Sequence, residues 1–417
     1  MDIKKWANSL FTKIRDNKIF YKYGNLSPVW LNLGKNKTLL DAYYGIPELN
    51  AVINYGAEAL SNGIWKYSDE KGEEKPEHSS LKLLNNPNPI QNGKELLKDY
   101  YVYRAVFGNS FMYKLYPEGR KPIFDNIKCL YNIPSQEMTV KMTGRLFQQT
   151  DINEIIEKYL FGVDGDEFEV QDILLQNDIG IKYIGGQYIL GQSRLIGLGK
   201  ALSNIVAAYE SRNVLMNSRG AIGAWVNDQK DGVGASYALK SDDKKELIDN
   251  ANKNYGLTNG RSAIMVTNAN VRWEGNTFDN KRLQLLEETE QNFFKICDAF
   301  ATPKELFSNT KGATFTNRDS AEQSLYRNRI IPIAEDLANG LTKFLFIDKG
   351  KLWLDYSHLE ALQEDEKLKA EKNQRNAQII LSLQKSVKEE NTSLTSAIQQ
   401  LIYLFGITED KAKLILT

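Results

Sequence analysis

Leu81-Lys82-Leu83-Leu84-Asn85-Asn86-Pro87-Asn88-Pro89 is the stretch that decides the fold, together with Gly108-Asn109-Ser110-Phe111 further along the chain. The asparagines and prolines of the first stretch predict a tight turn. Residues 92–106 lie between the two stretches and carry apolar residues at helical spacing, which predicts a helix that ends at Gly108. Residues 110–116 are rich in aromatic residues and predict a strand. The order is therefore turn, helix, strand.

The first 190 residues predict an α+β domain. Residues 47–62 have Pro47 at their start and apolar residues on one face, as expected of a helix. Short runs rich in β-forming residues predict further strands at 127–132, 137–142, 157–161 and 181–184.

Two long helices are predicted next, at 193–217 and 279–300, on either side of a small α/β piece. Within that piece we expect a helix at 241–255 and strands at 221–227, 262–267 and 270–274. Both long helices have broad apolar faces, which must be buried somewhere. A symmetric ring of copies would bury them, and so would a monomer that folds the helices back on its own domain.

The last third of the chain is predicted to be mainly helical. A helix over 318–345 contains Pro332, which removes a backbone hydrogen bond and predicts a kink. Two short strands, 343–347 and 351–355, are expected to meet at a turn around Gly350. The tail is expected to form a separate helical subdomain.

Composition excludes several classes of protein. The 417 residues include 53 Lys and Arg and 53 Asp and Glu, so the net charge is zero, and a protein that coats nucleic acid is not expected. Two cysteines and two histidines are too few for a disulfide framework, a zinc site or a histidine-based triad. No apolar run is long enough for a membrane span and no signal peptide is recognised, so we expect the chain to stay in the cytoplasm where it is made.

Residues that could support chemistry have simpler structural interpretations. Asp164, Asp166 and Glu167 could hold a hard cation, but their order does not match an EF-hand, and a solvated turn is favoured. Ser193 lacks the second glycine of a nucleophile elbow and is expected to cap a helix. His78 has no catalytic companion in the sequence. We therefore predict no catalytic residue, no metal and no cofactor, and expect that the protein is not an enzyme.

The order of these motifs resembles the portal proteins of long-tailed double-stranded-DNA bacteriophages. In that family a leucine pair, an asparagine–proline turn, a helix and a Gly-Asn-aromatic strand follow one another, as residues 81–111 do here. Gly191-Gln192-Ser193-Arg194-Leu195 resembles the family's Gly-x-Ser-Pro-Leu helix opening, with Arg194 in place of proline. Residues 217–223 resemble the end of the family's first long helix, and Gln284-Leu285-Leu286-Glu287 with Ile296, Phe300 and Pro303 resemble the motif of its second.

The resemblance implies a portal-like α+β fold with a mixed α/β wing, a two-helix stem, a small α/β clip insert, a kinked helix and a helical crown. The implied parts are an N-terminal arm (1–40), wing (41–190), stem helix (191–219), clip (220–276), second stem helix (277–303), tunnel loop (304–317), kinked helix (318–345), wing return strands (346–358) and crown (359–417).

The resemblance also implies the function and the partners. Portals form rings, usually of twelve subunits, at one capsid vertex of the virion, and they are assembled in the host cytoplasm. The ring is a conduit for double-stranded DNA during packaging and ejection. Expected partners are other copies of the chain, the terminase large subunit, the head–tail connector or adaptor, and the major capsid and scaffold proteins, with no membrane.

Three cations bracket the implied tunnel loop: Lys304, Lys311 and Arg318. We expect them at the DNA channel, with Lys311 reaching into it, although an exposed loop lysine is an equally simple interpretation of Lys311. Two other hypotheses remain open. One is a metal-dependent nucleic-acid-processing enzyme that uses Asp164 and Asp166, and the other is a different oligomeric phage head component, such as an adaptor or a scaffold.

Overall fold

A computed structural model gives the structure of the 417-residue chain. It describes residues 30–117, 119–120, 123–144, 151–162, 165–178, 189–217, 223–227, 242, 245–246, 249, 271–275, 285–307, 315–347, 349–389, 393–405, 411 and 413–414. The chain divides into two units, and the larger comprises residues 34–198 and 291–417. The smaller comprises residues 1–33 and 199–290.

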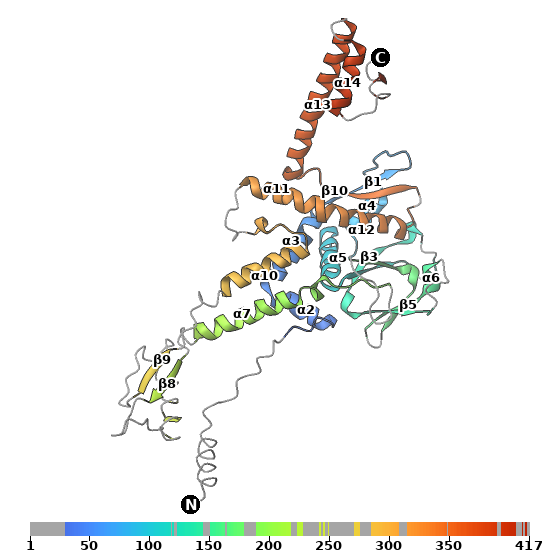
Figure 1. The fold of residues 1–417 in the computed structure, drawn as a ribbon. Helices are drawn as coiled ribbons and strands as arrows, with labels where there is room; N and C mark the ends of the chain where they lie inside the picture. The colour runs from blue at the N-terminus through green and yellow to red at the C-terminus, as the bar shows by residue number, and fades with distance from the viewer. Residues whose placement is uncertain are drawn as a thin grey trace, which may run out of the picture. The chain divides into compact units, whose positions relative to one another are not determined.

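The larger unit mixes helices and strands (Figure 1). Its helices are α2 (Asn36–Gly45), α3 (Pro47–Ser61), α4 (Ser79–Asn85), α5 (Gly93–Phe107), α6 (Ile152–Ile155), α11 (Phe315–Leu325), α12 (Ile331–Phe344), α13 (Glu360–Lys388) and α14 (Leu394–Phe405). Its strands are β1 (Ile64–Asp69), β2 (Asn109–Leu115), β3 (Cys129–Ile133), β4 (Met138–Met142), β5 (Ile156–Phe161), β6 (Asp166–Phe168), β7 (Ile173–Asn177) and β10 (Gly350–Asp355).

Helix α5 lies at the centre of the predicted wing and packs against α3 and β2. It begins with a capping box, in which the Asn92 side chain accepts from the Glu95 N–H and the Glu95 carboxylate accepts from the Asn92 N–H. It ends at Gly108, whose φ of 77° is left-handed. The helices predicted at 47–62 and 92–106 are thus confirmed.

Two three-stranded antiparallel sheets, in the orders β3-β2-β7 and β4-β5-β6, enclose one apolar core. Phe111 of β2 and Tyr159 of β5 meet edge to face in this core, with ring centroids 5.9 Å apart. The strands predicted at 110–116, 127–132, 137–142 and 157–161 are confirmed. The strand predicted at 181–184 lies outside the described residues.

The hairpin predicted from strands 343–347 and 351–355 is wrong. Residues 343–344 end α12, because Phe344 continues the buried face formed by Leu337 and Leu341. Only β10 is a strand, and it pairs antiparallel with β1, about 280 to 290 residues earlier in the chain. Local turn residues carry no information about so distant a partner, which explains the error.

The helix predicted over 318–345 is interrupted just before Pro332. Residues Tyr326–Ile330 form a π-helical turn between α11 and α12, and the Ile331 N–H bonds to the Tyr326 carbonyl five residues earlier. Proline has no N–H to donate to the carbonyl four residues earlier in a helix. The wider π turn accommodates this missing hydrogen bond. A kink was predicted at Pro332, and the structure has a π turn directly before this proline.

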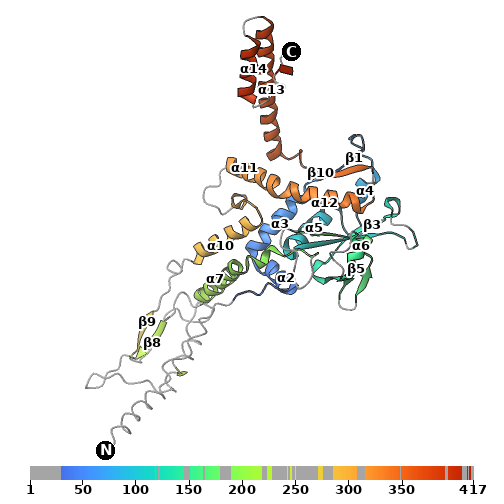
Figure 2. The same cartoon turned by 45° about the vertical axis from the view of Figure 1, so that its right-hand side comes forward.

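The predicted crown contains two helices, α13 and α14, which lie side by side in Figures 1 and 2. Their shared core is small, with Ala397, Ile398 and Leu401 buried against residues of α13. Leu381 of α13 is 62% exposed. No described helix in the chain is long and apolar enough to cross a lipid bilayer.

The smaller unit contains α7 (Gly199–Asn217) and the antiparallel pair β8 (Gly223–Asn227) and β9 (Val271–Gly275). The helix predicted from residue 193 begins instead with a 3-10 turn, Arg194–Ile196, capped by Ser193 as predicted. The strands predicted at 221–227 and 270–274 match β8 and β9. Residues 262–267, and most of 241–255, lie outside the described residues.

The boundary between the units falls inside α10 (Leu285–Ala299), the second predicted stem helix. Leu202 and Ile205 of α7 and Ile296 of α10 are fully buried within one chain. Leu286, near the start of α10, is 63% exposed.

Candidate functional site

The structure describes two of the three cations expected at the channel. Lys304 begins a 3-10 turn, Lys304–Leu306, and its Nζ lies 4.2 Å from the centre of the Phe294 ring. Arg318 is exposed in the first turn of α11. Residues 308–314, and with them Lys311, lie outside the described residues. Lys304 and Arg318 thus stand at the two ends of the segment predicted to be the tunnel loop.

The upstream end of this segment is firmly packed. After α10 the chain turns at Ala301, which has a left-handed φ of 49°, and the buried Thr302 donates its N–H to the Cys297 carbonyl at 2.9 Å. Phe307 then meets Phe293 edge to face, with ring centroids 5.2 Å apart. A loop that leaves this point starts from a fixed position.

Tyr55 of α3 contacts the upstream end of the segment and feels charges from its downstream end. Its ring lies 5.6 Å from that of Phe307 on the upstream side. On the downstream side, burial and the charge of Glu322 raise the pKa of Tyr55, while the charge of Arg318 opposes the rise. Sequence reasoning missed this residue, because a tyrosine on a predicted helix gives no sign of a contact 250 residues away.

Arg194, the residue that departs from the family motif, holds three elements together. Its guanidinium binds both carboxylate oxygens of Asp178, with Nε–Oδ2 at 2.5 Å and Nη2–Oδ1 at 3.0 Å. Its Nη1 donates to the Ala299 carbonyl at the end of α10, at 2.7 Å. Arg329 of the π turn lies 3.6 Å from Asp178, whose side chain is only 1% exposed. The buried Asp178 thus joins the end of β7 to the π turn directly and to the end of α10 through Arg194.

A second buried cation fixes the end of α12. Lys114 of β2 is 1% exposed, and its Nζ donates to the Phe344 carbonyl at 3.0 Å. The rings of Phe344 and Phe346 lie 4.3 Å and 4.1 Å from the same Nζ. Burial lowers the pKa of Lys114 to about 8, and the charge of Asp172 opposes this shift. The helix that follows the π turn is therefore tied to the central strand of the wing.

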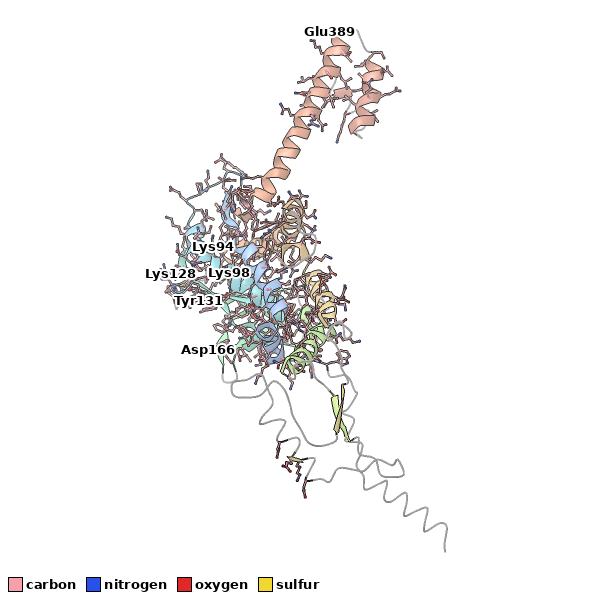
Figure 3. All side chains as sticks on the ribbon, turned by 90° about the vertical axis from the view of Figure 1, so that its left-hand side faces the viewer. Lys94, Lys98, Lys128, Tyr131, Asp166 and Glu389 are labelled. Carbon is pink, nitrogen blue, oxygen red and sulfur yellow. The ribbon has the colours of Figure 1, made fainter. Side chains whose placement is uncertain are left out.

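The residues considered for metal chemistry do not come together among the described residues. Asp164 lies outside them, and Asp166 is exposed at the start of β6 (Figure 3). Glu167 pairs with Lys158 at 2.5 Å, and this hydrogen bond lowers the pKa of Glu167. His78 caps α4 and stacks on Tyr67 at 3.8 Å. In the described part of the chain, no three His, Cys, Asp or Glu side chains form a cation site.

Solved structures share this fold at low sequence identity. One is the neck of an empty gene transfer agent particle computed with C6 symmetry, 20% identical, with a TM-score of 0.59 over 83% of this chain and 91% of that one. Another is the same kind of neck, from a native particle, computed with C12 symmetry (20% identity, TM-score 0.55, 85% and 91% covered). A third is an HK97-family phage portal protein from Corynebacterium diphtheriae (12% identity, TM-score 0.50, 76% and 94% covered).

Sequence comparisons assign the chain to a protein family. An uncharacterized protein of Rickettsia bellii is 19% identical over 338 residues, which cover 80% of this chain and 83% of that protein. The family described as "Phage portal protein" matches residues 47–381, from the start of α3 into α13. Because this match spans most of the 417 residues, the chain belongs to the phage portal protein family.

Proposed function

We propose that this chain assembles into a closed ring at one capsid vertex of a virion and forms the conduit through which double-stranded DNA enters and leaves. The observation that supports this most strongly is the family match over residues 47–381. The ring is proposed to have twelve subunits, in keeping with the C12 symmetry used for the neck of a similar fold. In the virion the ring would contact the major capsid protein and, during assembly, scaffold proteins.

The two predicted stem helices, α7 and α10, are proposed to line up around the ring axis, with β8 and β9 in the clip. The clip would dock the terminase large subunit during packaging and the head–tail connector afterwards. The chain itself is proposed to perform no catalysis, so ATP hydrolysis for packaging would belong to the terminase.

Charge balance suits a conduit. Each phosphate that a channel cation neutralises adds affinity, so a strongly basic lining would hold DNA back. The chain as a whole is neutral, and the predicted loop is bracketed by only a few cations. We propose that Lys311 reaches the channel from the loop whose ends are fixed by Phe307 and α11.

Neutralising Lys311 tests this assignment. Lys311→Gln is expected to change the length of DNA packaged per particle, because one cation per subunit is removed where DNA passes. The measurement is the size of DNA extracted from purified particles, by pulsed-field electrophoresis. The exposed Lys71 lies in a turn of the wing, and Lys71→Gln serves as the matched control. An unchanged DNA length in Lys311→Gln particles would count against the channel role.

A further inference from the structure

A hollow of about 420 Å³ lies between the outer edge of β7 and one face of α12. Five consecutive residues, Leu174–Asp178, line it on the strand side. Asp336, Asn339, Gly340 and Lys343 line it on the helix side, at the i, i+3, i+4 and i+7 spacing of a single helix face. The groove therefore runs along the strand, as a site for an extended chain would.

Among the described strands, β7 pairs with β2 alone and so lies at an edge of its sheet. The Asp178 N–H donates to the Gly108 carbonyl at 2.8 Å, on the β2 side. Backbone groups of an antiparallel strand point alternately to its two sides, so those of Leu175 and Asn177 point outward, into the groove. No described residue accepts from or donates to these outward backbone groups.

Two side chains that line the groove are more than nine-tenths buried and carry unpaired polar atoms. Arg104 is 7% exposed, and no described residue hydrogen-bonds to its Nε. Gln176 is 8% exposed and donates to the Asp336 carbonyl at 2.8 Å, while no described residue donates to its Oε1. Leaving buried polar atoms unpaired costs free energy, so these atoms indicate a ligand that carries both donors and acceptors.

The charges of the groove point to the same kind of ligand. Arg104 and Lys343 balance Asp178 and Asp336, and Arg104 already pairs with Asp336 at 2.8 Å. A groove with no net charge is poorly suited to phosphate or another free anion. A donor, an acceptor and a strand edge that no described residue pairs with together match a polypeptide main chain, which adds to the sheet as a further strand.

The sequence contains a suitable strand outside the described residues. Ile19-Phe20-Tyr21-Lys22-Tyr23 consists of four strong β-formers and one lysine, and it is followed by Gly24-Asn25, a turn pair. Its five residues match the length of β7. In an extended chain, Lys22 and Phe20 share one face and Ile19, Tyr21 and Tyr23 the other, so Lys22 can meet the half-exposed Asp336.

We propose that residues 19–23 of a neighbouring copy add as a strand to the outer edge of β7, in the groove beside α12. Each copy would then receive the arm of one neighbour and give its own arm to the other neighbour. Such a head-to-tail exchange closes when the copies form a ring. This inference rests on the ring of the proposed function.

Photo-cross-linking of the full-length protein tests the exchange. With p-benzoylphenylalanine in place of the exposed Lys343, irradiation is expected to give a dimer band on a denaturing gel. Mass spectrometry should find the cross-linked peptide to contain residues 19–23. The matched control carries the same residue in place of Glu335, which is exposed on α12 but does not line the groove, and it should not capture that peptide.

A second variant keeps the groove intact and changes only the arm. Tyr21→Pro removes one N–H from the added strand and should reduce the dimer band to the level of the Glu335 control, whereas Tyr21→Phe should keep it. Cross-links within one copy, or to residues 179–188, would overturn the proposal. Micrographs of the same sample separate the two hypotheses: rings without the cross-link reject the arm exchange alone, and an absence of rings rejects the proposed function.

Discussion

Asp178→Asn is expected to lower the free energy of unfolding by about 3–5 kcal/mol, as removal of one partner from a buried ion pair does. The substitution keeps the shape of the side chain but leaves the Arg194 guanidinium without its bidentate partner. It also removes the counter-charge that faces Arg329 in the π turn. The measurement is the midpoint and slope of urea-induced unfolding, compared with the unsubstituted protein.

An exposed ion pair provides the control for this experiment. Glu167 pairs with Lys158 at the surface, and Glu167→Gln is expected to cost less than about 1 kcal/mol. A cost for Asp178→Asn no larger than that of Glu167→Gln would show that the buried carboxylate does not hold β7, α10 and the π turn together.

Gly108→Ala is expected to lower the free energy of unfolding by about 2–5 kcal/mol. Gly108 has a φ of 77°, which disfavours any residue with a Cβ. In addition, a Cβ added here would lie 2.4 Å from the carbonyl carbon of Gln192 and 2.7 Å from the Ser193 nitrogen. Both are backbone atoms, so the strain cannot be relieved by turning a side chain.

Gly119 separates the two causes. It has nearly the same φ, 75°, but no heavy atom lies within 4 Å of the position of an added Cβ. Gly119→Ala should therefore show only the conformational cost, about 1–2 kcal/mol. Thermal unfolding of both variants checks the difference, and equal losses would mean that the approach of residues 192–193 to Gly108 does not contribute.

Local sequence patterns were sufficient for the helices and strands whose signals lie within a few residues. The asparagine and glutamate that cap α5 and the glycine that ends it are adjacent to the helix they bound. The periodic apolar residues that predict α3 likewise lie within the helix itself. A kink at Pro332 was expected because proline removes a hydrogen bond wherever it stands in a helix, but the π turn that precedes it was not predicted.

Interactions between distant segments could not be predicted from such patterns. The pairing of β10 with β1 depends on residues nearly 290 positions apart. Arg194 appeared in the sequence only as a departure from a motif, and its role became clear when the fold brought it to Asp178 and Ala299. Lys114 lies in a strand where a lysine would normally face solvent, yet the end of α12 encloses it.

The candidate channel site was predicted only in outline. The order of segments predicted a loop between Lys304 and Arg318, and the structure adds the packing of Phe307 against Tyr55 and Phe293 that fixes its upstream end. The role of Lys311 stays a prediction, because it lies outside the described residues. The unpaired groups beside β7 had no signal in the sequence, since they depend on which strand is at the edge of the sheet.

The mass and shape of the purified full-length protein test the central claim most directly. We predict that electron microscopy shows closed rings with a central hole. Mass photometry should then give a particle close to twelve times the 47.5 kDa of one chain. A stable 47.5 kDa particle that stays single at high concentration, with no rings in the micrographs, would contradict the account.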